Sequence, residues 1–218
     1  MTEPVVELMV FIDVICPWCY VGKRRLEKAL ALLGADAPIH VTWRPFELNP
    51  DMPAEGMERR LYRIRKFGSW ERSQQLDAQL TETGTQEGLH FRYDLMARTP
   101  NTFNAHRLIW LAGQSGDQGP LVEALMRGYF TEGRDIGDLD VLADVASASG
   151  MERSRIKMFL EGQDGGVEVR AYEDAVRRAG ISGVPAFIAN RRPMAMGAQP
   201  PDALASALRD VLALTPVA

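Results

Sequence analysis

The chain has 218 residues, a length that allows one or two domains with a sizeable apolar core. Apolar residues make up 46% and charged residues 25%, values typical of globular proteins, and the net charge is −4. Basic and acidic residues are mixed along the chain, so the sequence offers no basic surface of the kind that binds nucleic acid.

The N-terminal apolar run argues against two further classes of protein. It contains Glu7 and Asp13 and is far shorter than the roughly 20 residues that a membrane span requires. It also lacks the basic segment and the small-residue cleavage site of a signal peptide. We therefore expect a cytoplasmic protein without a membrane partner, in a compartment where permanent disulfides are rare.

In chain order, residues 5–12 form an apolar, β-branched run typical of a buried strand, and residues 20–33 carry apolar side chains at helical spacing. Cys16-Pro17-Trp18-Cys19, which contains both cysteines of the chain, lies between these two segments. Cys16 would then stand at a helix N-terminus, where unpaired N–H groups and the helix dipole stabilise a thiolate. The pattern therefore predicts a redox site.

A zinc site and a structural disulfide fit the cysteine pair less well. The three histidines, His40, His90 and His106, show no paired spacing that would complete a zinc site, so we expect no metal. A structural disulfide across so short a loop would remove little chain entropy. A Cys-x-x-Cys motif beside a β-α-β pattern instead indicates thioredoxin-like chemistry.

The rest of the chain alternates between strand and helix patterns. Residues 39–46 have the signature of a strand, which gives a β-α-β start. Helices are expected at residues 54–83 with a break near Gly68, 102–112, 120–130, 139–148, 153–160 and 167–179, followed by strands at 186–190 and 194–196 and a helix at 201–214. We predict an α/β protein in which a helical insertion domain, residues 53–180, interrupts a thioredoxin-like domain made of residues 1–52 and 181–218.

Gly183-Val184-Pro185-Ala186 precedes the strand expected at 186–190. Proline lacks an N–H and suits the first position of a strand, and the bond before a proline is the common place for a cis peptide. In a thioredoxin-like fold, a cis-proline loop packs against the cysteines, and the main chain of Val184 would pair with an extended substrate. The plain alternative is a trans proline that only starts the strand.

Three segments together resemble the DsbA family and, within it, the cytoplasmic FrnE-like branch: residues 11–22 (FIDVICPWCYVG), 101–108 (NTFNAHRL) and 183–187 (GVPAF). The resemblance spans essentially the whole chain. It implies a thioredoxin fold with a large helical insertion and a dithiol–disulfide oxidoreductase or isomerase activity on thiol or disulfide substrates. It implies no bound cofactor, with glutathione as a candidate co-substrate. By the same resemblance, Cys16 is the attacking thiol, Cys19 the resolving thiol and Pro185 the cis-proline.

Two features depart from the family pattern. Pro17-Trp18 stands between the cysteines where the periplasmic oxidant DsbA has Pro-His, and the loss of the imidazole should make the pair less oxidising. The extra C-terminal cysteine pair of some FrnE-like proteins is absent, because the chain has two cysteines in all.

Two other functions stay open at this point. The superfamily includes glutathione-dependent 2-hydroxychromene-2-carboxylate isomerases and kappa-class glutathione transferases, in which a serine typically occupies the position of Cys16. Trp18 and the segment from Asn101 to His106 would suit the small-molecule cleft of such an enzyme. The third candidate is a redox-inert module that holds extended peptide by strand addition near Val184.

Four residues near the motifs have both a functional and a structural interpretation. Asp13 could accept a proton from Cys19 or could cap the loop before the helix. His106 and Asn101 could line a substrate cleft, or they could be an ordinary helix-flank histidine and a helix cap. Trp18 is expected to contact substrate, because an aromatic side chain between two redox cysteines has no core to fill.

Two basic runs have a binding and a structural interpretation, and the structural one is expected for both. Lys23-Arg24-Arg25 could attract acidic substrates or glutathione, but it is predicted to form a solvated helix face. A second basic set could touch a partner, but it is predicted to form helix ion pairs with Glu55 and Glu58; it comprises Arg59, Arg60, Arg63, Arg65 and Lys66.

Overall fold

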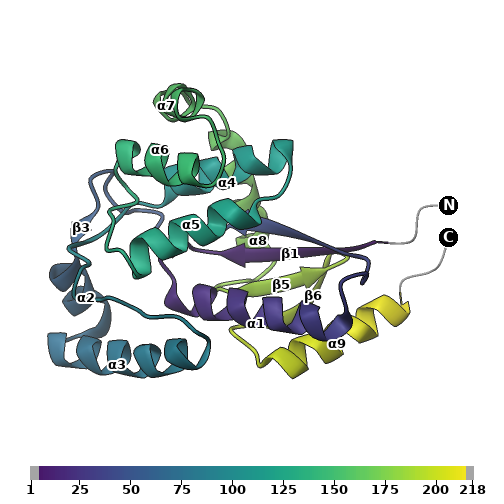
Figure 1. The fold of residues 1–218 in the computed structure, drawn as a ribbon. Coiled ribbons are helices and arrows are strands. Elements are labelled where there is room, and N and C mark those ends of the chain that lie inside the picture. Colours follow the sequence, from purple (N-terminus) through teal and green to yellow (C-terminus); the bar gives the residue numbers. More distant parts are fainter. Residues whose placement is uncertain (1–4, 215–218) are drawn as a thin grey trace.

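The computed structural model describes residues 5–214, so residues 1–4 and 215–218 of the predicted thioredoxin-like domain lie outside the description. Its centre is a four-stranded sheet in the order β2-β1-β5-β6 (Figure 1). β1 runs parallel to β2, and β5 is antiparallel to β1 and β6. The strands are β1 (Val6–Ile12), β2 (Ile39–Pro45), β5 (Ala186–Ala189) and β6 (Arg192–Met196).

Helix α1 (Pro17–Leu33) connects β1 to β2, which confirms the predicted β-α-β start, and α9 (Pro201–Leu214) packs beside α1 (Figure 1). A small ribbon of β3 (Met57–Glu58) and β4 (Arg98–Thr99) lies between β2 and β5 in sequence. The helices in the same stretch are α2 (Arg59–Phe67), α3 (Trp70–Gln86), α4 (Phe103–Ser115), α5 (Gly119–Phe130), α6 (Leu139–Ala148), α7 (Arg153–Glu161) and α8 (Gly166–Arg178).

The predicted helices are all present, and one of them begins several residues later than expected. The first starts at Pro17 directly after Cys16, as predicted, and proline suits this first turn, where its missing N–H leaves no bond unmade. The helix expected from residue 54 begins at Arg59, because the Glu58 carboxylate caps it by accepting from the backbone N–H groups of Arg60 (2.9 Å) and Leu61 (2.6 Å).

The side chains of β1 alternate between two cores, because successive residues of a strand point to opposite faces of a sheet. The even-numbered residues from Val6 to Ile12 belong to the larger core, which also contains residues of α1 and α9. Met9 and Phe11 belong to a smaller core that includes Val176 of α8. Helix α8 therefore covers the second face of the sheet, although the predicted boundary at residue 180 assigns it to the helical insertion.

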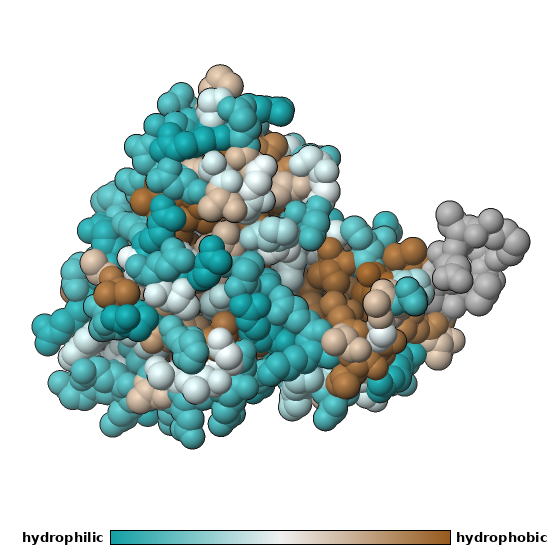
Figure 2. Space-filling view, in the orientation of Figure 1, coloured by the Kyte–Doolittle hydropathy of each residue, from teal (hydrophilic) through white to brown (hydrophobic). Residues whose placement is uncertain are grey.

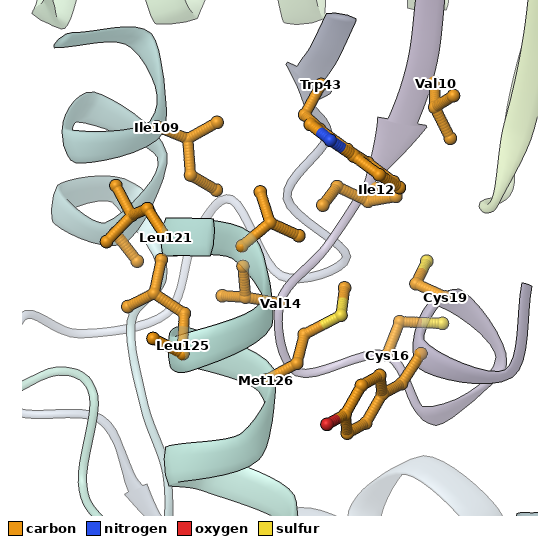
Figure 3. Close-up of a cluster of buried hydrophobic side chains, with 14 of the residues drawn as sticks. Val10, Ile12, Val14, Cys16, Cys19, Trp43, Ile109, Leu121, Leu125 and Met126 are labelled. Atoms are coloured by element: carbon orange, nitrogen blue, oxygen red, sulfur yellow. The ribbon is translucent and has the colours of Figure 1, made fainter. Parts of the chain in front are cut away.

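The larger core continues from the sheet into the predicted insertion (Figure 3). Ile12 of β1, Trp43 of β2 and Met126 of α5 are members of this one cluster. Cys16 and Cys19 belong to it as well, and the close-up shows them on the first turns of α1 beside these side chains. The burial of the insertion helices therefore supports the start of α1 directly.

The side chain of Gln118 covers part of the free edge of β2, the outermost strand on one side of the sheet. The Trp43 N–H donates to Oε1 of Gln118 (2.8 Å), and Nε2 of Gln118 donates to the Trp43 carbonyl (3.1 Å). The buried amide thus pairs with the main chain as a neighbouring strand would. An edge occupied in this way is protected from strand addition at that point.

The visible surface is largely hydrophilic (Figure 2). An apolar patch stands out where the C-terminal half of α1 lies beside α9. Leu32, near the end of α1, is 52% exposed. This patch lies at the far end of α1 from the two cysteines.

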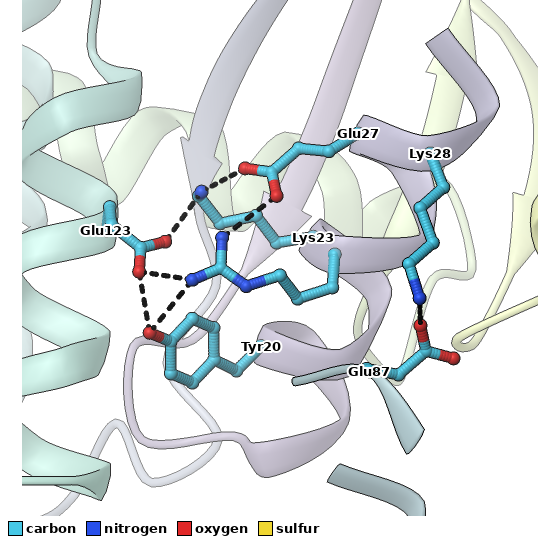
Figure 4. Close-up of polar contacts among 7 residues, drawn as sticks. Tyr20, Lys23, Glu27, Lys28, Glu87 and Glu123 are labelled. Atoms are coloured by element: carbon cyan, nitrogen blue, oxygen red, sulfur yellow. Dashed lines mark hydrogen bonds and ion pairs between the residues drawn. The ribbon is translucent and has the colours of Figure 1, made fainter. Parts of the chain in front are cut away.

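Polar residues of α1 bind the insertion through one carboxylate on α5 (Figure 4). Glu123 accepts hydrogen bonds from Tyr20 Oη (2.7 Å), Lys23 Nζ (2.7 Å) and Arg24 Nη2. Burial alone would raise the pKa of Glu123, but the hydrogen bonds from Lys23 and Tyr20 lower it, so the carboxylate stays charged. Lys23 is itself 5% exposed.

The third member of this basic run binds a different helix. Arg25 Nε donates to Glu87 Oε1 (2.6 Å), just after α3, and Arg25 Nη1 donates to the Ala198 carbonyl (2.6 Å). The prediction that Lys23-Arg24-Arg25 forms a solvated face is therefore wrong, because its acidic partners come from helices distant in sequence.

The Glu123→Gln variant should lose about 2 kcal/mol of unfolding free energy, because the variant leaves buried Lys23 with one of its two carboxylate partners. Urea unfolding followed by circular dichroism measures this loss. The matched control is Glu132→Gln, whose exposed pair with Arg127 should contribute less than about 0.5 kcal/mol. An equal, small loss in both variants would show that the Glu123 contact adds nothing to stability.

Candidate active site at the start of helix α1

Cys16 occupies the N-cap position of α1, as predicted, and its backbone is extended (φ −90°, ψ 112°). Its carbonyl accepts from the Cys19 N–H (3.0 Å), which closes the first helical turn around the motif. The unpaired N–H groups at the start of a helix favour negative charge in general. Both cysteines are free thiols.

The two thiols differ in their surroundings. Cys16 is 5% exposed and lines a pocket, whereas Cys19 is fully buried behind it. Burial raises the pKa of Cys19 well above its usual range, and the neighbouring Cys16 raises it further. Cys16 is therefore the thiol that a substrate can reach, and Cys19 is held as a protonated thiol.

The loop before β5 lies against Cys16. The Val184 carbonyl is 3.8 Å from Cys16 Sγ, and the Val184–Pro185 peptide bond is cis. Gly22 of α1 allows this close approach, because a Cβ there would lie 2.8 Å from Pro185 Cγ. The structure thus brings Cys16, Val184 and Pro185 together as the sequence predicts, and Gly22 is a contributor that the sequence analysis did not single out.

A pocket of about 320 Å³ opens beside Cys16, between the start of α1, helix α2 and the loop before β5. Trp18 lies in its wall and is 44% exposed, and its predicted contact with substrate stays a prediction. Much of the remaining wall is apolar, formed by Ile15, Leu48, Leu76, Leu80, Met96 and Phe130.

Asn101 and His106 do not line this pocket, so for both residues the structure agrees with the structural alternative and not with a place in this cleft. Asn101 braces the chain instead, since its Oδ1 accepts from the Phe103 N–H (2.9 Å) and its Nδ2 donates to the Met52 carbonyl (2.7 Å). His106 is 1% exposed and points into the protein interior, where Nε2 lies 3.5 Å from Asp13 Oδ1.

Asp13 is fully buried just behind the cysteine motif. It accepts from the backbone N–H groups of Ile15 (3.4 Å) and Leu48 (2.8 Å), which fits the predicted loop-capping role. Its negative charge is also among the causes that raise the pKa of Cys19. Burial alone would lower the pKa of His106, but the nearby carboxylate of Asp13 raises it.

Two further buried carboxylates, those of Glu47 and Glu173, adjoin His106. Glu173 accepts from the Glu47 N–H, and Arg170 binds the carboxylates of both Glu47 and Glu173. Burial, together with the repulsion of Glu173, raises the pKa of Glu47 to about 7. Glu47 therefore gains and loses its proton near neutral pH.

Helix α2 provides cations that the sequence analysis assigned to surface ion pairs. Arg59 and Arg63 both bind the buried carboxylate of Asp77 on α3 and line the pocket. The predicted pairing with Glu58 is wrong, because Glu58 caps the helix instead. The signal that could have located them is their spacing, since residues four apart lie on one helix face.

Residues 7–209 match the DSBA-like thioredoxin domain, which is well over half of the chain. The chain belongs to this family. The match confirms the predicted thioredoxin fold and the resemblance to the DsbA family. It also confirms the predicted enzyme class, a disulfide oxidoreductase of the DsbA type, at the level of the family.

Solved structures of similar proteins agree with the assignment of this chain to the DSBA-like family. The probable DsbA oxidoreductase SCO1869 from Streptomyces coelicolor is 32% identical, with a TM-score of 0.89 over 98% of this chain and 93% of that chain. Two others share the fold, both at a TM-score of 0.66. They are a 2-hydroxychromene-2-carboxylate isomerase (17% identical, 95% of each chain) and the cytosolic disulfide reductase DsbM from Pseudomonas aeruginosa (18% identical, 95% of this chain and 99% of that chain), which has also been solved with GSH.

Neither a candidate metal site nor a membrane-crossing helix occurs within residues 5–214. In this part of the chain, no group of three or more histidine, cysteine, aspartate or glutamate side chains is arranged to hold a metal ion. Across the same residues, no helix has both the length and the apolar character needed to cross a membrane.

The two thiols of this DSBA-like protein should alkylate at different rates. At pH 7, iodoacetamide should modify Cys16 in the Cys19→Ser variant at least about tenfold faster than Cys19 in the Cys16→Ser variant, because burial hides Cys19 and keeps it protonated. Mass spectrometry of quenched samples measures both rates. Unfolding in urea should abolish the difference, and a folded Cys19 that reacts as fast as Cys16 would contradict the assignment.

Replacing Glu47 by Gln should flatten the pH dependence of stability between about pH 4.5 and 7. The folded protein keeps a proton on Glu47 to about pH 7, whereas the unfolded chain loses it near pH 4.5. The folded state thus binds more protons in this window, and its unfolding free energy falls as the pH rises. Urea unfolding should show a loss on the order of 2 kcal/mol that is smaller in the variant. Equal losses in the two proteins would exclude this role for Glu47.

Proposed function

We propose that this DSBA-like protein exchanges thiols and disulfides through attack by Cys16 and resolution by Cys19. The observation that carries the proposal is the asymmetry of the pair, since Cys16 faces the pocket from the helix N-terminus while Cys19 is buried behind it. The attacking sulfur of such a pair must be reachable and readily ionised, and the second sulfur must be close and protected.

Atoms and electrons balance in this exchange. The Cys16 thiolate attacks one sulfur of a substrate disulfide, forms a mixed disulfide and releases the other sulfur as a thiolate. Cys19 then loses its proton and attacks Cys16 Sγ, which releases the second substrate thiolate and leaves a Cys16–Cys19 disulfide. The substrate is reduced by two electrons and the protein is oxidised by two. The reverse sequence oxidises a substrate dithiol.

Asp13 is the residue that we propose as the acceptor of the Cys19 proton. Asp13 is buried close enough to Cys19 for its charge to act on the thiol. Its contact with His106 provides a second group that can take part in holding the proton. The Val184 main chain would pair with substrate, and the exposed ring of Trp18 would contact it.

The proposed substrates are protein or small-molecule thiols and disulfides in the cytoplasm, with glutathione as one co-substrate. The pocket size favours a role for small molecules, since about 320 Å³ lies at the lower end of small-molecule sites. Pro17-Trp18 between the cysteines supports a pair less oxidising than that of periplasmic DsbA, and with it a place in the FrnE-like branch.

A glutathione-dependent isomerase or transferase is the second candidate function. The observation that favours it is the largely apolar pocket beside Cys16, which would hold a small aromatic substrate. The cysteine pair argues against it, because an enzyme that activates the thiol of glutathione needs no second thiol behind the first. Turnover of an aromatic isomerase substrate by a Cys19→Ala variant would support this alternative.

The Cys19→Ala variant should accumulate mixed disulfides when it is incubated with oxidised insulin or glutathione disulfide, because the resolving thiol is missing. Non-reducing gels and intact-mass spectra measure the adducts, which should disappear on addition of dithiothreitol. The control is Cys16→Ser, which should form at least about tenfold fewer adducts because Cys19 is buried. A protein that forms no adduct with either disulfide is not a thiol–disulfide oxidoreductase.

A further inference from the structure

The face of α2 that lines the pocket is cationic and aromatic. It consists of Arg59, Tyr62, Arg63, Lys66 and Phe67, which recur at the three- and four-residue spacing of one helix face. A helix normally turns an apolar stripe towards the protein interior. Arg59 is buried and Arg63 half-buried, so their charges require compensating negative charge, whereas Lys66 lines the pocket as an exposed residue.

The charges of this face are not balanced by the protein. Asp77 alone pairs with both Arg59 and Arg63, and the amine of Lys66 donates to the Tyr62 hydroxyl (2.6 Å) rather than to a carboxylate. Burial lowers the pKa of Arg63, and repulsion by Arg59 lowers it further although Asp77 acts in the opposite direction. Among the described residues, Arg59 and Arg63 thus share one carboxylate, and Lys66 pairs with none.

Hydrogen-bond donors remain available on the same wall. Arg59 Nη2 donates to Asp77 Oδ2 (2.6 Å), and no described residue accepts from its Nε or Nη1. The hydroxyl of Tyr93, which also lines the pocket, is buried and has no hydrogen-bond partner in the described chain. A guanidinium fork beside a phenol hydroxyl can bind a carboxylate with charge-assisted hydrogen bonds.

Apolar residues of the same lining would bind the rest of such a ligand. They are Leu48, Leu76, Leu80, Met96 and Phe130, and Cys16 and Trp18 lie in the same pocket. A ligand that fills the pocket would thus meet cations, hydrocarbon and the reactive sulfur at the β1–α1 loop. A molecule that joins an apolar body to a carboxylate and a sulfur has one group for each of these three parts of the pocket.

We propose that the pocket selects small disulfides and thiols that join an apolar, preferably aromatic, body to a carboxylate, with Arg59 and Lys66 as the specificity-determining cations. This inference rests on the proposed thiol–disulfide exchange, because the ligand's sulfur is placed at Cys16. The low exposure of Cys16 favours a small molecule over a folded protein as the substrate that reaches this pocket.

Ligand binding can be tested without redox chemistry. Calorimetry on the Cys16→Ser protein compares para-ethylbenzoate with para-ethylbenzamide, which differ in charge and little in shape. The carboxylate should bind about tenfold tighter, as expected for a charge-assisted contact. Arg59→Gln in this background should remove the preference. Lys66→Gln should reduce it as well, and it leaves the Asp77 pairs intact in case Arg59→Gln fails to fold.

The matched control is Arg65→Gln on the opposite face of α2, where Arg65 is exposed and contacts Met57 Sδ (3.7 Å). It should keep the full preference. The inference is overturned if the amide binds as tightly as the carboxylate, or if Lys66→Gln and Arg65→Gln have equal effects.

Exchange kinetics separate this inference from the proposed function. The reduced protein reacts with dithiobis(nitrobenzoate), which is anionic, and with dithiodipyridine, which is uncharged, and each rate is divided by that of free cysteine. In each reaction the Cys16 thiolate displaces one aryl thiolate, and Cys19 displaces the second. The normalised ratio of anionic to neutral probe should fall about tenfold in Arg59→Gln and stay unchanged in Arg65→Gln.

Each failure then has its own signature. Rapid exchange with dithiodipyridine and an unchanged ratio in Arg59→Gln would overturn the substrate class while the proposed function stands. No exchange with either probe would overturn the proposed function, and the calorimetry would still decide whether the pocket binds carboxylates.

Discussion

The close approach of α1 to the loop before β5 is the constraint on which the site depends. Because Gly22 has no side chain, α1 packs directly against Pro185. Cys16, at the start of the helix, thereby lies against the Val184 carbonyl. β1 holds the same helix start from the other side, through the short loop that Asp13 braces. Cys16 is therefore positioned by two strands and one helix rather than by a flexible loop, and this rigidity suits a sulfur that must attack and be attacked along a defined line.

Burial then divides the chemistry between two identical side chains. The core formed by the sheet and by α5 encloses Cys19, whereas the pocket leaves Cys16 accessible. The polar groups behind the motif are buried as well, from Asp13 and His106 to Glu47 and Glu173. Beyond the effect of burial, the members of this network affect one another's charge, since His106 and Arg170 lower the pKa of Glu47 while Glu173 raises it.

Local patterns predicted the elements and the redox pair well, and long-range partners limited the rest. The strand at β1, the break near Gly68 and the placement of Cys16 follow from periodicity, turn residues and one motif within a few residues of each other. The surroundings of Lys23 and Arg59 depend on Glu123 and Asp77, which lie on other helices. A basic run looks the same in sequence whether it faces water or a buried carboxylate, so only the tertiary fold distinguishes the two.

Helix α2 is short, and it is joined to the sheet through the two-residue strands of a small ribbon. The cysteines and the cis-proline lie on elements that the central sheet fixes, while the charged wall of the pocket lies on this separate piece. Relatives with the same redox centre could therefore diverge in substrate by exchanging a few side chains on α2, with no change to the core that positions the sulfurs. Substrate choice and redox chemistry would then evolve independently, and an engineer could graft one wall without rebuilding the other.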